Sequence, residues 1–147
     1  MKTEATCAAR ILLVDENLRG SRTRKLILEG VGYSVETALS GEEAWDLFQK
    51  TRFDVVVTDF RMSGMDGVKL IQLLRSVESP VRIVMLSGFV NCLGLSQENT
   101  GADEVIAKSN KEVPELLRAV KKLSQQPPPR RAGSVRRASS LKTSRAV

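Results

Sequence analysis

Short apolar runs alternate with amphipathic stretches over most of this chain. Five runs predict β-strands, namely Ile11–Val14, Tyr33–Leu39, Asp54–Thr58, Val81–Leu86 and Val105–Ala107. Their apolar content is mainly Val, Ile and Leu, which is typical of parallel strands buried on both faces. Segments of helical character lie between and after these runs. The alternation therefore predicts an α/β fold: a doubly wound, five-stranded parallel sheet with helices on both faces.

Start signals, stop signals and apolar faces predict the helices. Asn17–Glu29 has helical character and leads into Gly30 and Gly32, which favour helix termination. Ser40–Glu43 forms a capping box and opens a helix that buries Ala44, Leu47 and Phe48. The apolar faces of the third and last helices consist of Leu70, Ile71, Leu74 and Val77, and of Val113, Leu116, Leu117, Val120 and Leu123. The segment 89–100 has no clear apolar stripe, so we expect a short or distorted helix there.

The composition changes after residue 124. Residues 125–147 contain Pro127–Pro129, which forbids a helix, and are otherwise mainly Arg, Ser, Ala and Gly. Six of the 23 Lys and Arg residues lie there and no acidic residue does, so that the remaining basic residues equal the 17 acidic residues in number. We therefore expect a neutral folded domain at residues 9–124 and a disordered basic tail at residues 125–147.

Several classes of protein are disfavoured by what the chain lacks. Histidine is absent, and Cys7 and Cys92 are far apart, which argues against a zinc site. No apolar run approaches the length of a membrane span, and residues 1–9 have no apolar signal core, so we expect a cytoplasmic protein that does not contact the membrane. The tail is too polar for a helix-turn-helix module, and we expect no DNA-binding domain after residue 124. Nucleic acid is expected to bind only nonspecifically, through the tail.

Four of the predicted strands end in side chains that suit the handling of a phosphate. Asp15 and Glu16 follow the first strand, Asp59 the third, Ser87 the fourth and Lys108 the fifth. Because ligands of open parallel sheets bind outside the carboxyl ends of the strands, we expect these groups to converge. An aspartate is a competent nucleophile for phosphoryl transfer, Mg2+ prefers carboxylate and water oxygens, and a lysine can pair with a phosphoryl oxygen. Each residue alone is typical of a cap, a turn or a solvated surface, and only the joint pattern indicates this chemistry.

The stretches around these strand ends form specific motifs. They are Ile11–Glu16, Val56–Gly67, Val84–Gly88, and Gly101–Asp103 leading to Lys108. With them the chain, over residues 9–124, resembles the receiver domains of two-component response regulators.

The resemblance implies a fold, a site and a role. The fold is flavodoxin-like with strand order 2-1-3-4-5. Asp59 is the phosphoacceptor, Ser87 the switch hydroxyl and Lys108 the phosphate-contacting lysine. The Mg2+ ligands are Asp15, Glu16, Asp59 and the backbone carbonyl of Arg61. Such a protein is not a conventional enzyme, since it catalyses only its own phosphorylation and slow dephosphorylation.

The resemblance also implies partners. The phosphoryl donor is a histidine kinase or a phosphotransfer protein. The output is expected to be a contact with a downstream protein target, and a homodimer is compatible with this role.

Four positions depart from the receiver pattern. Glu16 stands where a second aspartate is commoner and is one methylene longer, and Ser63 and Ser109 stand where the family usually has proline. Val105 replaces the aromatic residue that usually lies three positions before the lysine. A valine cannot make the large rotamer change of Tyr or Phe, whereas a movement of the Ser87 hydroxyl is unaffected by it.

Two alternatives were weighed against the receiver interpretation. Haloacid-dehalogenase phosphatases also use an aspartate at a strand end, but they need an acid two residues later, where this chain has Arg61. A pseudo-receiver binds partners without being phosphorylated. Val105 and Glu16 leave that alternative open, although the phosphoacceptor, the hydroxyl and the lysine are all present.

Overall fold

The computed structural model describes residues 8–77, 79–88 and 93–125. Its strands are β2 (Arg10–Val14), β3 (Ser34–Ala38), β4 (Val55–Asp59), β5 (Arg82–Ser87) and β6 (Glu104–Ala107). All neighbouring strands pair in parallel, in the order β3-β2-β4-β5-β6. In chain order this is 2-1-3-4-5, so the predicted strand order is confirmed.

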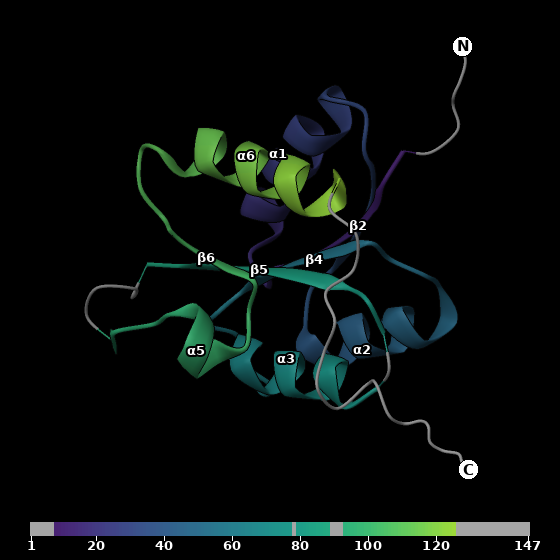
Figure 1. The fold of residues 1–147 in the computed structure, drawn as a ribbon, viewed down its shortest axis with the longest axis vertical. Helices are drawn as coiled ribbons and strands as arrows, with labels where there is room; N and C mark the ends of the chain where they lie inside the picture. Colours follow the sequence, from purple (N-terminus) through teal and green to yellow (C-terminus); the bar gives the residue numbers. More distant parts are fainter. Residues whose placement is uncertain (1–7, 78, 89–92, 126–147) are drawn as a thin grey trace.

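Helices cover both faces of the sheet (Figure 1). One face carries α1 (Leu18–Gly30) and α6 (Glu112–Gln125), and the other carries α2 (Gly41–Lys50), α3 (Gly67–Ser76) and the short α5 (Gln97–Thr100). This arrangement confirms the predicted flavodoxin-like α/β fold.

The register of the sheet aligns the carboxyl ends of its strands. Val14 of β2 lies opposite Thr58 of β4, and Ser87 of β5 lies opposite Ala107 of β6. The residues that follow these strands therefore emerge at the same edge of the sheet, where parallel α/β proteins bind their ligands.

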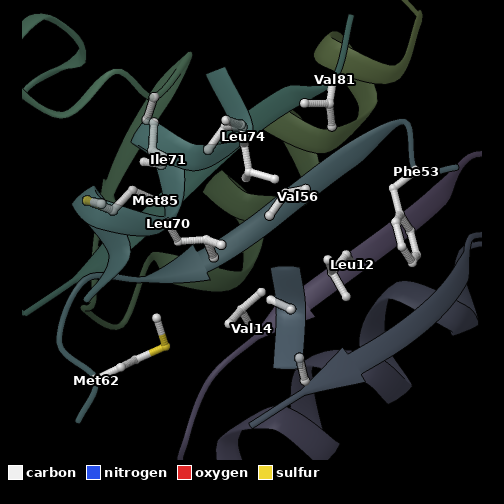
Figure 2. Packing of buried hydrophobic residues seen from close by; sticks show 14 residues of the cluster. Leu12, Val14, Phe53, Val56, Met62, Leu70, Ile71, Leu74, Val81 and Met85 are labelled. Carbon is white, nitrogen blue, oxygen red and sulfur yellow. The ribbon is translucent and has the colours of Figure 1, made fainter. Parts of the chain in front are cut away.

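Strand side chains alternate between two apolar cores, one on each face of the sheet. Leu12 and Val56 pack with Leu74 of α3 on one face (Figure 2). Ile11 packs with Val120 of α6 on the other face. Burying each such side chain contributes about 1.5–3 kcal/mol, so the two cores hold the strands, and with them the site, in fixed positions.

Polar side chains cap the helices near the predicted starts. The Gly20 N–H donates to the Asn17 side chain at the start of α1, and the Glu43 N–H donates to the Ser40 hydroxyl at the start of α2. The capping box differs from the expected form in one detail. The Glu43 carboxylate accepts from the N–H of Leu39, at 2.8 Å, and so reaches one residue further back than the capping serine.

Two predicted helix faces need correction at their ends. Val77 is not part of α3, because the helix ends at Ser76 and Val77 has an extended backbone and an exposed side chain. Val113, in the first turn of α6, is also exposed, whereas the buried stripe of this helix starts at Leu116 and includes Ala119. Apolar periodicity does not define where a helix ends, and both errors lie at such an end.

The predicted weak helix is confirmed as a single short turn. The four residues of α5 lie between the N-cap Ser96 and Gly101, whose φ of 84° is left-handed. The Ser96 hydroxyl accepts from the Asn99 N–H, and the Asn99 side chain accepts from the Ser96 N–H. Residues 89–92, the first part of the predicted segment, lie outside the described residues.

The predicted domain boundary stays a prediction. Gln125 is the last residue of α6, and residues 126–147 of the predicted tail lie outside the described residues. Within the described ranges, none of the helices has the length and apolar character needed to cross a bilayer.

Candidate functional site

Asp59 lies at the centre of the site, as the last residue of β4, with 8% of its surface exposed. Lys108, the first residue after β6, places Nζ 2.6 Å from Asp59 Oδ1. The Lys108 N–H donates to the Ser87 carbonyl at 2.9 Å, which fixes the lysine to the end of β5. Burial raises the pKa of Asp59 above its ordinary value; the ion pair with Lys108 opposes this increase, and the nearby Asp15 charge adds to it.

Asp15, the residue after β2, is the second buried acid and is 2% exposed. Its Oδ1 accepts from the N–H of Asn17 at 2.9 Å, and its Oδ2 lies 2.6 Å from Nη1 of Arg24 in α1. The Nε of the same arginine lies 2.6 Å from Oε2 of Glu112, the first residue of α6. Burial alone lowers the pKa of Arg24, but its hydrogen bond to Glu112 and the charges of Glu112, Asp15 and Asp59 outweigh this effect and raise the pKa overall. Arg24 therefore bridges two acids from different parts of the chain.

Glu16 lies beside Asp15 in the sequence but is bound to a different part of the structure. Its Oε1 accepts from the N–H of Ser63, in the loop after β4, at 2.8 Å. A proline at position 63 would have no N–H to donate. The two departures from the receiver pattern at positions 16 and 63 thus meet in one hydrogen bond.

The remaining predicted site residues lie at the same edge or next to it. Ser87 is buried at the end of β5, and Arg61 is exposed in the loop after β4. Val105 lies within β6, opposite Met85, and packs half-buried against the core that contains Leu12.

Gly67 holds the end of the loop after β4 close to the backbone of Asp59. Its N–H donates to the Phe60 carbonyl at 2.9 Å. A Cβ at this position would lie 2.3 Å from the backbone oxygen of Asp59 and 3.1 Å from Cα of Phe60. Only glycine allows α3 to start so close to the end of β4.

Mg2+ is the metal that the resemblance to receiver domains implies, and two carboxylates of the site fit it. Among the described residues, no three His, Cys, Asp or Glu side chains are grouped so as to hold a metal by themselves. Asp15 and Asp59 are nevertheless buried and close enough for the charge of one to raise the pKa of the other. Mg2+ usually takes one or two carboxylates together with water and phosphate oxygens, and this pair fits that requirement.

Sequence reasoning missed Arg24, Glu112 and Gly67. The signal for Arg24 was its spacing in α1, because Ser21 and Leu28, three residues before and four after it, are buried on the same face. An arginine on a buried face needs a buried partner. The signal for Gly67 was its place directly after the Asp66 cap, where the chain turns sharply into α3. Glu112 had no local signal.

Comparisons with known proteins agree with this geometry. The family model "Response regulator receiver domain" matches residues 11–121. The gliding motility regulatory protein of Myxococcus xanthus is 30% identical over 129 residues, which are 83% of this chain and 16% of that protein. A probable transcriptional regulator, ycf27, of Porphyra purpurea is 37% identical over 114 residues, which are 76% of this chain and 46% of that protein. The chain thus spans less than half of the length of either relative.

A solved structure gives the same result. The response regulator protein TrrA of Thermotoga maritima, determined in complex with Mg2+ and BeF, is 32% identical with a TM-score of 0.70. The match covers 78% of this chain and 98% of that one. The chain belongs to the family of response regulator receiver domains, which act in two-component signalling. A receiver domain is not a conventional enzyme, as expected from the sequence.

Proposed function

We propose that this receiver takes a phosphoryl group on Asp59 and passes the signal on through a partner-binding face. The observation that carries the proposal is the buried Asp59 carboxylate at the end of β4, with Lys108 Nζ 2.6 Å from one of its oxygens. A carboxylate at a strand end, facing a fixed cation, is suited to attack phosphorus and to hold the product.

The chain's own residues account for most of the reaction. One Asp59 oxygen forms the new bond to phosphorus while the bond between phosphorus and the donor atom breaks, and the donor keeps that electron pair. Lys108 and the Ser87 hydroxyl, both at this edge of the sheet, are assigned to the phosphoryl oxygens. Lys108 also favours the ionised form of Asp59, which is the nucleophilic form.

Mg2+ is assigned to the same edge. Asp15, Glu16, Asp59 and the Arg61 carbonyl are the proposed ligands, and the ion supplies charge neutralisation for the transferred group. Support comes from the two buried acids, whose repulsion a cation relieves. Glu16 Oε1 accepts from the Ser63 N–H, so its other carboxylate oxygen would be the one offered to the ion.

The partners follow from the class of protein. Receiver domains interact with kinases and downstream targets. For this chain we assign a histidine kinase or a phosphotransfer protein as donor and a protein as target, in a cytoplasmic setting.

The phosphorylation proposal is tested with acetyl phosphate and Mg2+. One base-labile phosphoryl group should appear on the wild type, by mass spectrometry, and none on Asp59→Asn. Asp46→Asn, which changes an exposed acid on α2, is the matched control and should be labelled normally. Labelling of Asp59→Asn to the wild-type level would overturn the assignment.

One observation favours a second function, a phosphorylation-independent interaction module. Arg24 pairs with Asp15 and Lys108 pairs with Asp59, so each buried acid of the site has a cationic partner within the chain. Beryllofluoride with Mg2+ separates the two functions. A phosphoacceptor shows amide NMR shifts at Ser87 and Lys108, whereas a pure interaction module shows none.

A further inference from the structure

Arg24 occupies an unusual position for a strong cation. It comes from the buried face of α1 and is 13% exposed, and its two nitrogen contacts, to Asp15 and to Glu112, are both 2.6 Å long. The two helices that it joins, α1 and α6, lie on the same face of the sheet (Figure 1). A planar guanidinium can serve two carboxylates at once, whereas a lysine ammonium is a point charge.

The chain leaves room for this side chain at Gly20. A Cβ at Gly20 would lie 3.1 Å from Nη1 of Arg24 and 3.3 Å from Oδ2 of Asp15, which is tighter than ordinary packing allows. Ser21, the next residue, is small and buried. The start of α1 is thus shaped so that Arg24 can reach the carboxylate.

Arg24 contacts the Asp15 oxygen that a divalent cation would most easily use, because the other oxygen already accepts a backbone hydrogen bond. Asp15 Oδ1 accepts a hydrogen bond from the Asn17 N–H, and Oδ2 accepts one from Arg24 Nη1. A buried carboxylate without a partner is costly, so Asp15 retains the arginine until another cation replaces it. Glu112 lowers the free energy needed to replace Arg24 at Asp15, because the guanidinium keeps Glu112 as a partner after it has left Asp15.

We propose that Arg24 is a positioning residue that acts as an internal counter-ion: it occupies Asp15 in the metal-free protein and withdraws onto Glu112 when Mg2+ binds. The inference rests on the proposed function in placing Mg2+ at Asp15. It adds that the metal affinity of this receiver is set by competition with its own arginine, with Glu112 as the acceptor of the displaced side chain.

The experiment is a calorimetric Mg2+ titration of the full chain and its variants. Arg24→Gln should bind Mg2+ about 5- to 150-fold more tightly than wild type, the usual range for coupled sites. Glu112→Gln should bind more weakly, because the displaced arginine has lost its second partner. An Arg24→Gln affinity equal to that of wild type, or weaker, overturns the inference.

The double variant separates displacement from a general charge effect. If Glu112 acts through Arg24, then Glu112→Gln changes nothing once Arg24→Gln is present. If both residues act only through their distant charges, the two effects add, and the inference is overturned. Should Arg24→Gln not fold in EDTA, Glu112→Gln is compared with Glu115→Gln, which removes another negative charge from the first turn of α6. Weaker Mg2+ binding in Glu112→Gln alone supports the inference, and equal weakening in both variants, or none, overturns it.

Thermal melts with and without Mg2+ distinguish a counter-ion from a purely structural ion pair. Loss of a purely structural pair lowers the melting temperature by the same amount in both conditions. Arg24→Gln should melt below wild type in EDTA, and the deficit should shrink in saturating Mg2+, because the ion replaces the arginine. Arg75→Gln, which breaks the ion pair with Asp103 (3.0 Å, side chains 19% and 20% exposed), is the matched control. Its deficit should be the same with and without Mg2+; an Arg24→Gln deficit that also stays constant overturns the inference.

Failure of this inference and failure of the proposed function give different results. Wild type that binds Mg2+ with an affinity unchanged in Arg24→Gln overturns only the role of Arg24. Wild type that binds no Mg2+ overturns the role of Arg24 and the proposed metal site together, whereas labelling of Asp59 remains a separate measurement.

Discussion

The proposed role of Asp59 as phosphoacceptor requires a carboxylate that is both ionised and shielded from water. Burial raises its pKa, so in the metal-free protein its charge works against the folded state. A group with a raised pKa contributes stability that is present below its unfolded pKa and is lost as the pH rises through its folded pKa. The burial that raises the Asp59 pKa thus lowers the stability of the domain at neutral pH.

The loss of stability caused by the Asp59 charge predicts that a neutral residue at this position stabilises the protein. Asp59→Asn should raise the free energy of unfolding at pH 7 in EDTA, although it loses the ion pair with Lys108. The gain should shrink as the pH falls toward 3.8, the ordinary aspartate value, because wild-type Asp59 then becomes neutral as well. Urea unfolding between pH 3.5 and about 8 measures this, within the range where carboxylates titrate. A variant that is less stable than wild type at pH 7 contradicts the prediction.

Glu16 and Ser63 provide a second test at the scale of single residues. In Glu16→Asp the side chain is too short to accept the hydrogen bond from the Ser63 N–H, and in Ser63→Pro the N–H is missing. Each variant should therefore lose about 0.5–1.5 kcal/mol of free energy of unfolding. Because both changes remove the same hydrogen bond, the double variant should cost no more than the worse single variant. Denaturant midpoints of the four proteins give the coupling, and simple additivity would show that the two residues act independently.

The helices and strands were largely predictable because local signals define them. The strands could be predicted from their apolar runs, and the start of α2 from Ser40, since a cap and a periodicity are properties of neighbouring residues. Two residues of the predicted apolar faces were misjudged: Val77 lies beyond the end of α3, and Val113, in the first turn of α6, is exposed, because burial in a terminal turn depends on what that turn touches. Periodicity carries no information about that contact.

The start of α3 gives a prediction about an element rather than a side chain. Gly67→Ala places a Cβ 2.3 Å from the Asp59 carbonyl, and a backbone atom cannot move aside as a flexible side chain can. The variant should lose about 1–3 kcal/mol of stability or more, and it should be phosphorylated more slowly because the end of β4 shifts. Gly30→Ala at the end of α1 is the control: its Cβ would meet nothing within 4 Å, and it should be neutral or slightly stabilising. Equal effects in the two variants would show that the close contact is unimportant.

At the scale of the whole molecule, the sequence predicted that the site residues converge at one edge of the sheet. It did not predict which of them form ion pairs with one another. Parallel strand ends meet at one edge, so Asp59 and Lys108 were expected together, and their ion pair is 2.6 Å long. In the link from Asp15 through Arg24 to Glu112, Arg24 and Glu112 lie 88 positions apart in the chain. Such a link depends on how α1 and α6 pack, and no local pattern records it.

The place of the two buried acids in the sheet has a consequence for how the domain opens. Asp15 directly follows β2 and Asp59 is the last residue of β4; these strands are neighbours in the sheet, and neither is an edge strand. Fraying of an outer strand or of a helix end therefore does not separate the two charges; only opening of the central pairing does, and that amounts to unfolding the whole domain. The proposed Mg2+ ion, if bound between them, should slow that event. The most protected amides of the sheet should then exchange more slowly when Mg2+ is added, whereas amides at the fraying ends should exchange as before. Binding at one site would thus lengthen the lifetime of the entire fold.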